Sequence, residues 1–139
     1  MPNLKLNPPN QPVGISVKRR LLDVGQCNAD HFRISKTLGK IFDIEIQRAH
    51  SHDEAIKLAM ATPFNLVLIN RLLDADGSPA LGVLNSLKAT PSTAETPVMI
   101  VSNFEDAQKT AVEAGAVQGF GKAALDSDET KELLAKYLS

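Results

Sequence analysis

Four polar residues, Asp23, Asn70, Ser102 and Lys122, each come at or just after the end of a short apolar run, which is where a buried strand would end. In open parallel α/β sheets the carboxyl ends of the strands share one edge, and ligands bind there. A carboxylate, a carboxamide, a hydroxyl and an amine at that edge predict one shallow polar pocket. Polar residues also follow strands because the chain turns there, so the prediction depends on how the whole chain is organised.

Short apolar runs alternate along the chain with stretches of helical spacing. The runs that are typical of short strands are Val17–Leu22, Ile44–Arg48, Leu66–Ile69, Val98–Val101 and Val117–Phe120. LVLI and VMIV are continuously apolar, as strands of a parallel sheet that is covered on both faces are. Five strands that alternate with five helices predict an α/β fold in which a parallel sheet lies between two layers of helices.

The helices are predicted from apolar residues three or four apart and from their end signals. Ser51-His-Asp-Glu54 is a capping box that begins the second helix. Gly115 ends the fourth helix, and Asp126 or Ser127 caps the fifth. The apolar residues that mark the five helices, in chain order, are Phe32, Leu38, Ile41 and Phe42; Ala55, Ile56, Ala59 and Met60; Leu81, Leu84 and Leu87; Ala107, Ala111 and Ala114; and Leu125, Leu133, Leu134 and Leu138.

The composition predicts a soluble protein with one domain. Of the 139 residues 43% are hydrophobic, and the net charge of −1 gives no general attraction to nucleic acid or to anionic membranes. No apolar run approaches the roughly 18–20 residues that span a bilayer. The N-terminus lacks a signal-peptide core, and the single Cys27 cannot form an internal disulfide, so we expect a cytoplasmic protein. Residues 1–15, rich in Pro and Asn, are expected to form a flexible tail before a folded domain at 16–139.

Several segments, taken in order, resemble the receiver domain of response regulators in two-component signalling. FNLVLINRLLDADG (64–77) resembles the third strand and following loop of that family, and TPVMIVSN (96–103) resembles its fourth strand. EAGAVQGFGK (113–122) resembles the fifth strand and the lysine after it, and HSHDEAIKLA (50–59) the entry to the second helix. The resemblance covers residues 17–139 and implies a flavodoxin-like, doubly wound five-stranded parallel sheet of order 2-1-3-4-5 with five helices.

The resemblance also implies a phosphorylation site, from which the chain departs at two positions. Receivers accept a phosphoryl group on an Asp that ends the third strand, and they bind Mg²⁺ through that Asp and an acidic pair that ends the first strand. Asn70 stands at the acceptor position, and a neutral carboxamide cannot form the acyl phosphate. Of the acidic pair only Asp23 is present, with Val24 in the second place. With one carboxylate of three, we expect weak or absent Mg²⁺ binding, no other metal and no cofactor.

Further positions follow from the same resemblance. Ser102 stands at the hydroxyl that follows the phosphate inward, and Lys122 at the lysine that holds a phosphate oxygen. Ala123 replaces the usual proline after that lysine. Gly119 takes the place of the switch aromatic, and Phe120 shifts to a position that we expect to be buried. These departures place the switching mechanism of the family in doubt for this chain.

Two interpretations of the remaining polar residues stay open. In the functional one, Lys122 and Asp23 still bind an anion or another ligand in the pocket. In the structural one, Lys122 pairs with Asp23 and hydrogen-bonds Asn70, and the three side chains only hold the strand ends together. Breaking such a partly buried pair would leave one charge unmatched.

Other polar clusters carry weaker predictions. The run Asp74–Gly77 has the beginning of a calcium-binding loop but lacks the glycine and the glutamate that such a loop needs at its sixth and twelfth positions. Cys27 with His31, and His50 with His52, could contribute metal ligands, but neither pair has a second pair at zinc-like spacing. We therefore predict no metal centre from these residues.

We expect the chain to be a stand-alone atypical receiver that acts by protein–protein interaction in a two-component phosphorelay, without aspartyl phosphorylation and without enzymatic activity. The expected partner is a histidine kinase or an output protein, bound through the fourth helix, fifth strand and fifth helix, a surface that also suits a homodimer. Because the chain ends with the fifth helix, we expect no output domain. Two alternatives stay open: a receiver regulated through Asp74, Asp23 or a small ligand, and a flavodoxin-like small enzyme or nucleotide binder that shares only the fold.

Overall fold

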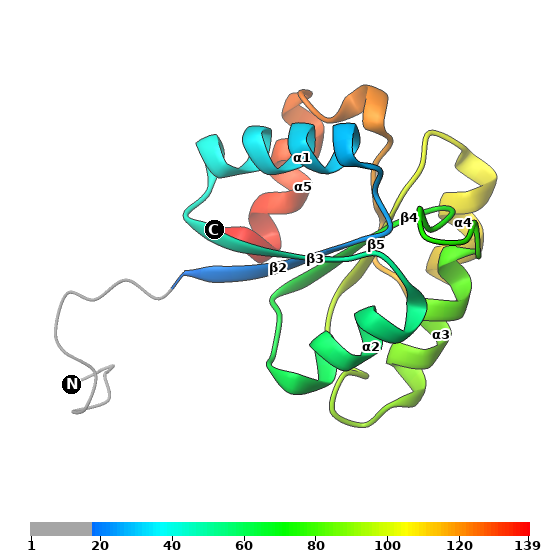
Figure 1. The fold of residues 1–139 in the computed structure, drawn as a ribbon. Coiled ribbons are helices and arrows are strands. Elements are labelled where there is room, and N and C mark those ends of the chain that lie inside the picture. Colours follow the sequence, from blue (N-terminus) through cyan, green and yellow to red (C-terminus); the bar gives the residue numbers. More distant parts are fainter. Residues whose placement is uncertain (1–17) are drawn as a thin grey trace, which may run out of the picture.

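The computed structural model describes residues 18–139, which form a parallel sheet between two layers of helices (Figure 1). The predicted tail at 1–15 lies outside the described residues. The strands are β2 (Arg19–Val24), β3 (Ile44–Ala49), β4 (Leu66–Asn70) and β5 (Val98–Val101). The helices are α1 (Asn28–Ile41), α2 (His52–Ala61), α3 (Ala80–Ala89), α4 (Glu105–Glu113) and α5 (Asp128–Leu138), with a short 3₁₀ helix, η1 (Lys122–Ala124), before the last. The predicted α/β fold class is confirmed.

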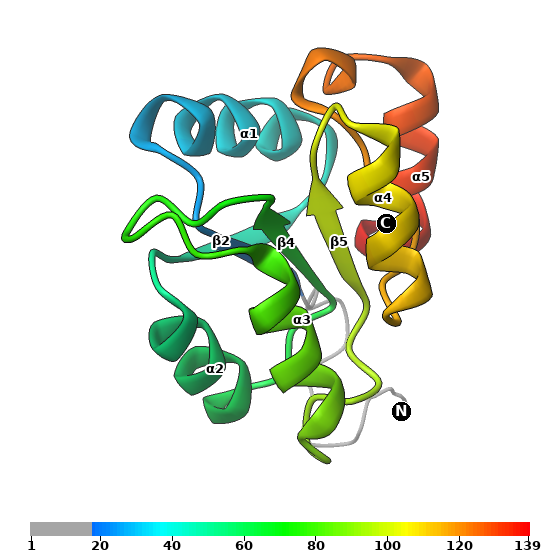
Figure 2. The same cartoon turned by 90° about the vertical axis from the view of Figure 1, so that its right-hand side faces the viewer.

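The four strands pair in the order β3-β2-β4-β5, and all pairs are parallel. This order matches the first four positions of the predicted 2-1-3-4-5 arrangement. Helices α1 and α5 lie on one face of the sheet, and α2, α3 and α4 on the other (Figures 1 and 2). Each face packs its own apolar cluster, one centred on side chains such as Leu21 and Leu134, the other on side chains such as Val67 and Leu84.

The predicted fifth strand at Val117–Phe120 is not a regular strand in the described structure. The segment runs beside β5 and makes one isolated parallel bridge, between Val101 and Phe120. The side chain of Gln108, from α4, is inserted between β5 and this segment. Its Nε2 donates to the Ile100 carbonyl oxygen at 2.8 Å, and its Oε1 accepts from the Gly119 N–H at 3.1 Å. This carboxamide bridges two backbone groups that would bond each other in a regular ladder. The prediction of a full five-stranded sheet is therefore not confirmed.

The helix ends follow the predicted signals. Ser51 caps α2 by accepting a hydrogen bond from the Glu54 N–H, and Ser127 caps α5 in the same way. Gly115 follows α4 with a φ of +111°, a conformation that favours glycine. None of the helices in residues 18–139 is long and apolar enough to cross a bilayer.

The residues that α1 buries are not all the ones that marked this helix in the sequence. Ile34 and Leu38, four residues apart, are the buried pair, whereas Phe32 is 66% exposed. Two residues correspond to about 200° around a helix, so Phe32 and Ile34 cannot lie on the same face. Met60, which marked α2, is likewise exposed, and Phe120 is buried as expected.

Candidate functional site

The carboxyl ends of the strands meet at one edge of the sheet, and three of the four predicted polar residues share a hollow there. Asn70 is the last residue of β4, Ser102 follows β5, and Lys122 begins η1. These three side chains line a hollow of about 200 Å³. Asp23, the fourth predicted residue, does not line it. The predicted convergence of polar groups is therefore present for three residues, and Asp23 belongs to a separate cluster.

Asp23 is fully buried, and groups of this same chain surround it. Its Oδ2 is 2.6 Å from Nδ1 of His31, on α1. Arg48 lies beside it in register on β3, and Gln26 follows β2 with its side chain also buried. Burial raises the pKa of Asp23 above its ordinary value, although the bond to His31 and the charges of His31 and Arg48 act in the opposite direction. The one retained acid of the predicted metal site is thus enclosed by a histidine and an arginine.

Val24, at the second position of the predicted acidic pair, is also fully buried. Its side chain belongs to the apolar cluster on the α2 and α3 face of the sheet, together with Ala49 and Leu73. A carboxylate in this environment would lose its hydration without gaining a partner. Val24 is therefore a core residue in this chain.

Lys122 pairs with a different acid from the one predicted. Its Nζ is 2.6 Å from Oδ2 of Asp30, in the first turn of α1, and the hydrogen bond holds the pKa of Asp30 below its ordinary value. Asn70 donates from Nδ2 to the carbonyl oxygen of Leu72 at 2.6 Å. The prediction that Lys122 pairs with Asp23 and bonds Asn70 is wrong because Asp23 is buried against His31, whereas Asp30 lies at the surface within reach of the amine.

Asp74, the other acid considered above, is engaged in a similar way. Its Oδ2 is 2.8 Å from Nδ1 of His50 and 3.9 Å from Nη2 of Arg48. The Asp74 N–H donates to the Gly25 carbonyl oxygen at 3.0 Å, which links the loop after β4 to the end of β2. Gly25 has a φ of +76°, and a Cβ at this position would lie 2.5 Å from the Leu73 side chain, so the link requires glycine.

Three residues of this region were assigned no such role from the sequence: Asp30, Arg48, and His31 as a partner of Asp23. Asp30 and Lys122 are 92 residues apart, and only the packing of α1 beside η1 brings them together. Arg48 reaches Asp23 through the register of β2 and β3. The one sequence signal that Arg48 could belong to the site was its position, as a charged residue at the end of an apolar run. No group of three or more His, Cys, Asp and Glu side chains suited to a metal ion occurs within residues 18–139.

No protein-family model and no curated protein sequence matches the chain. Solved structures of receiver domains match its fold. The Vibrio cholerae chemotaxis protein CheY4 superposes with a TM-score of 0.70 and 15% identity, over 88% of this chain and 100% of that one. The chain has the receiver fold. The phosphorylated cyanobacterial phytochrome response regulator RcpA gives a TM-score of 0.70 with 19% identity, over 88% of this chain and 96% of that one.

A third receiver domain, from the Pseudomonas aeruginosa sensor histidine kinase PA1611, carries a magnesium ion in its active-site cleft. It superposes with a TM-score of 0.68 and 12% identity, over 87% of this chain and 98% of that one. At the level of the fold, these receivers confirm the resemblance that the sequence motifs indicated. The receiver fold places Asn70 at the end of the strand β4, on the edge where Ser102 and Lys122 also lie.

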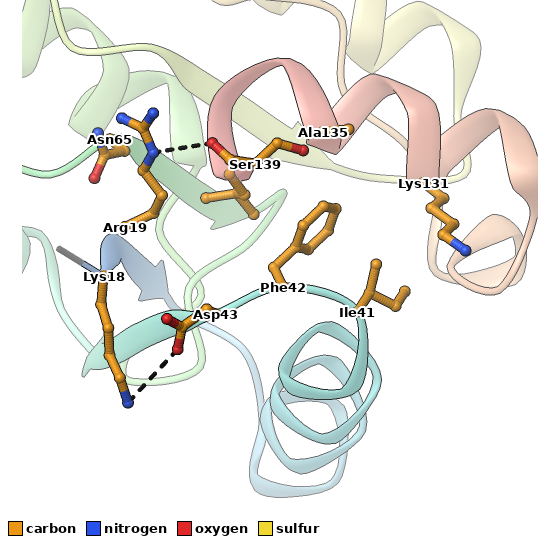
Figure 3. Close-up of a pocket in the computed structure, with 10 residues that line it drawn as sticks. Lys18, Arg19, Ile41, Phe42, Asp43, Asn65, Lys131, Ala135 and Ser139 are labelled. Atoms are coloured by element: carbon orange, nitrogen blue, oxygen red, sulfur yellow. Dashed lines mark hydrogen bonds and ion pairs between the residues drawn. The ribbon is translucent and has the colours of Figure 1, made fainter. Parts of the chain in front are cut away.

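A larger hollow, of about 670 Å³, lies at the opposite end of the receiver fold, where β2 begins and α5 ends (Figure 3). Its basic residues are partly paired: Lys18 Nζ is 3.9 Å from Asp43, and Arg19 Nε donates to the Ser139 carbonyl oxygen at 3.1 Å. Neither Asn70 nor Lys122 lines it. This hollow is therefore separate from the candidate site.

Proposed function

We propose that the chain is an atypical receiver that works in two-component signalling by binding another protein, without being phosphorylated on an aspartate. The observation that carries the proposal is Asn70 at the carboxyl end of β4. A carboxylate there would be the nucleophile in an acyl-phosphate reaction, whereas a carboxamide is neutral and a poor nucleophile. The receiver fold provides the frame for such a role, and the missing carboxylate removes the usual switch.

The surroundings of Asn70 support the same proposal. Phosphoryl transfer needs a divalent cation to neutralise charge, and Mg²⁺ requires charged oxygen ligands in near-octahedral geometry. Asp23 is enclosed by His31 and Arg48, and Val24 is a core residue. Val24 has no carboxylate, and Oδ2 of Asp23 is already bonded to His31. This arrangement supports the proposal that the site binds Mg²⁺ weakly or not at all.

Incubation with a small phosphodonor and Mg²⁺, followed by intact-mass measurement, tests the proposal. We expect no phosphoryl adduct on the chain, while an ordinary receiver in the same tube is labelled and proves that the donor is active. A stoichiometric adduct would refute the proposal. Peptide mapping of such an adduct would then assign it to Asp74, to Asp23 or to another side chain.

The single variant Asn70→Asp sharpens this test. We expect that it is not labelled to the level of the ordinary receiver, because Val24 and the enclosed Asp23 still leave the metal without its ligands. Full Mg²⁺-dependent labelling of Asn70→Asp would show that the acidic pair is not required, and our account of the metal site would be wrong.

We further propose that the partner binds the surface formed by α4, the segment 117–120 and α5. Two apolar side chains are exposed there, Phe104 just before α4 (60%) and Val112 within it (42%). Both line a shallow hollow of about 440 Å³. A histidine kinase or an output protein with an apolar anchor suits this surface, and so does a second copy of the chain.

Affinity capture with matched variants tests this surface. Phe104→Ser is expected to lose the signalling partner, whereas Phe32→Ser, which removes an equally exposed phenylalanine from α1, is expected to keep it. Light scattering of the same variants reports whether a dimer uses this face. Equal capture by wild type and Phe104→Ser would refute the assignment of the surface.

A further inference from the structure

Helices α3 and α4 leave a hollow of about 270 Å³ between them, on the face of the sheet that α2 also covers (Figure 2). Ile100 of β5, Ala80 of α3 and Ala111 of α4 line it, and all three are buried. Helix α3 packs on α2 and makes little direct contact with α4. Because alanine side chains are short, the space between the two helices stays unfilled and largely apolar.

Two side chains of opposite charge, Arg71 and Asp106, line this hollow near the beginning of α4. The guanidinium carbon of Arg71 is 5.0 Å from the centre of the Phe104 ring. Phe104 directly precedes α4, and Asp106 belongs to the first turn of that helix. Arg71 and Asp106 are both exposed, and within residues 18–139 neither forms an ion pair with another side chain. One positive and one negative charge are therefore available at the beginning of α4.

The remainder of the hollow offers an apolar surface along α4. Ala107 and Ala111 are four residues apart, so they line the hollow from successive turns of the helix, and Leu81 of α3 lines it as well. Sites for small molecules combine such an apolar surface with a few polar groups that fix the orientation of the ligand. The volume lies just below the range of about 300–1,000 Å³ that drug-sized ligands occupy, so it fits a smaller molecule with one apolar group.

We propose that this hollow binds a free α-amino acid with an apolar side chain, such as leucine or phenylalanine. Arg71 pairs with the carboxylate of the ligand, and Asp106 pairs with its ammonium group. The apolar side chain lies against Ala107 and Ala111. A molecule with only one of the two charges would be attracted by one of the protein's charges and repelled by the other, whereas both attract a zwitterion. The inference goes beyond the proposed function, because it places no requirement on position 70.

The hollow between α3 and α4 is distinct from the hollow at Asn70. Arg71 and Leu72 line both, whereas Lys122 lines only the hollow at Asn70 and Asp106 lines only the one between the helices. Binding in the two hollows can therefore be tested with separate variants.

Titration of the full chain with phenylalanine and with leucine, followed by NMR, tests this inference. We expect saturable shifts of the backbone amide resonances of residues 106–111, with a Kd on the order of 1 mM for ligands this small. Phenethylamine lacks the carboxylate and phenylpropionate lacks the ammonium group, so each is expected to bind about tenfold more weakly than phenylalanine. No saturable binding of either amino acid, or equal binding of phenylalanine and its two analogues, would overturn the inference.

Charge variants test the two polar contacts separately. Arg71→Gln is expected to lose the preference for phenylalanine over phenethylamine, and Asp106→Asn the preference for phenylalanine over phenylpropionate. Glu105→Gln and Lys109→Gln are the matched controls, because they remove exposed charges of α4 that do not line the hollow. Both controls are expected to keep the wild-type preferences. Unchanged preferences in Arg71→Gln and Asp106→Asn would overturn the assignment of the charges.

The variant Ala107→Leu fills the hollow without changing its charges. We expect it to lose the binding of both amino acids while its thermal unfolding stays close to that of the wild type, because Ala107 is only partly buried and leucine is a good helix former. Val112→Leu enlarges an exposed side chain of α4 outside the hollow and is expected to bind like the wild type. Unchanged binding by Ala107→Leu would overturn the inference. So would a loss of partner capture by Ala107→Leu without any binding of free amino acids, which would indicate that a side chain of a partner protein occupies the hollow.

Discussion

Removing the hydrogen bonds of the Gln108 carboxamide gives the most demanding test of this structure. Gln108 is 8% exposed, and its side chain bridges the Ile100 carbonyl oxygen and the Gly119 N–H. Gly119 allows this insertion because a Cβ there would overlap the Ile100 carbonyl oxygen. Gln108→Leu keeps the size of the side chain and removes these two hydrogen bonds. It also removes the longer ones from Nε2 to the carbonyl oxygens of Ser102 at 3.2 Å and Phe120 at 3.4 Å, so it measures what the carboxamide contributes.

The expected cost follows from the two backbone groups that would lose their partner. Each buried group left without a hydrogen bond costs about 1–3 kcal/mol, so the pair costs about 2–6 kcal/mol. The leucine side chain recovers about 1 kcal/mol through its greater apolar area. We therefore expect a net loss of about 3 kcal/mol, which for a domain of this size lowers the midpoint of thermal unfolding by about 10 °C.

Urea and thermal denaturation of three variants check this value. Gln118→Leu replaces an exposed glutamine on the neighbouring segment and is expected to unfold like the wild type. Gln108→Glu can still accept from Gly119 but cannot donate to Ile100 while it is ionised, so it should be destabilised at pH 7 and recover as acid protonates it. A midpoint for Gln108→Leu within about 2 °C of the wild type would refute the bridge as a stabilising contact.

Three further predictions concern the residues around the strand ends. The hydrogen bond from Lys122 lowers the pKa of Asp30, so this pair stabilises the fold above the ordinary value of 3.8 and the contribution is lost as pH falls through the lowered pKa. Asp30→Asn should therefore cost about 1 kcal/mol in urea unfolding at pH 7 and almost nothing near pH 2. Burial raises the pKa of Asp23. The contribution of this side chain to the free energy of unfolding is therefore full below pH 3.8 and is lost as pH rises through the raised pKa. Asp23→Asn, which stays neutral, should show a flatter dependence of unfolding midpoint on pH between 4 and 8, and a dependence as steep as that of the wild type would contradict the assignment. Gly25→Ala puts a Cβ 2.5 Å from the Leu73 side chain on a backbone with positive φ, so we expect it to lower the free energy of unfolding. A decrease of less than about 1 kcal/mol in urea unfolding would show instead that the loop adapts.

The sequence pattern predicted the arrangement of the fold well, because each buried strand is a continuous apolar run. LVLI and VMIV became β4 and the whole of β5, and the capping serines Ser51 and Ser127 began their helices as expected. The segment 117–120 failed as a strand for a reason that no local pattern shows. The side chain of Gln108, from α4, takes the hydrogen bonds that a strand would need, and it is 11 residues before Gly119 in the chain.

The candidate site was predictable in its positions and not in its pairings. Asn70, Ser102 and Lys122 follow apolar runs, and parallel strands bring such residues to one edge. Which cation meets which acid depends instead on the depth of each side chain. Asp23 is buried too deeply to reach Lys122, whereas Asp30, seven residues later, lies where the amine can reach it.

The burial of Val24 makes an acid costly to introduce at this position. An acid at this position would enter an apolar cluster, at a cost of several kcal/mol against a total stability of about 5–15 kcal/mol. That substitution would bring no chemistry until position 70 also changed, and Asp23 would still have to leave His31. A chain that combined acids at positions 24 and 70 would therefore have to tolerate the destabilisation from the buried acid before any phosphorylation chemistry could follow.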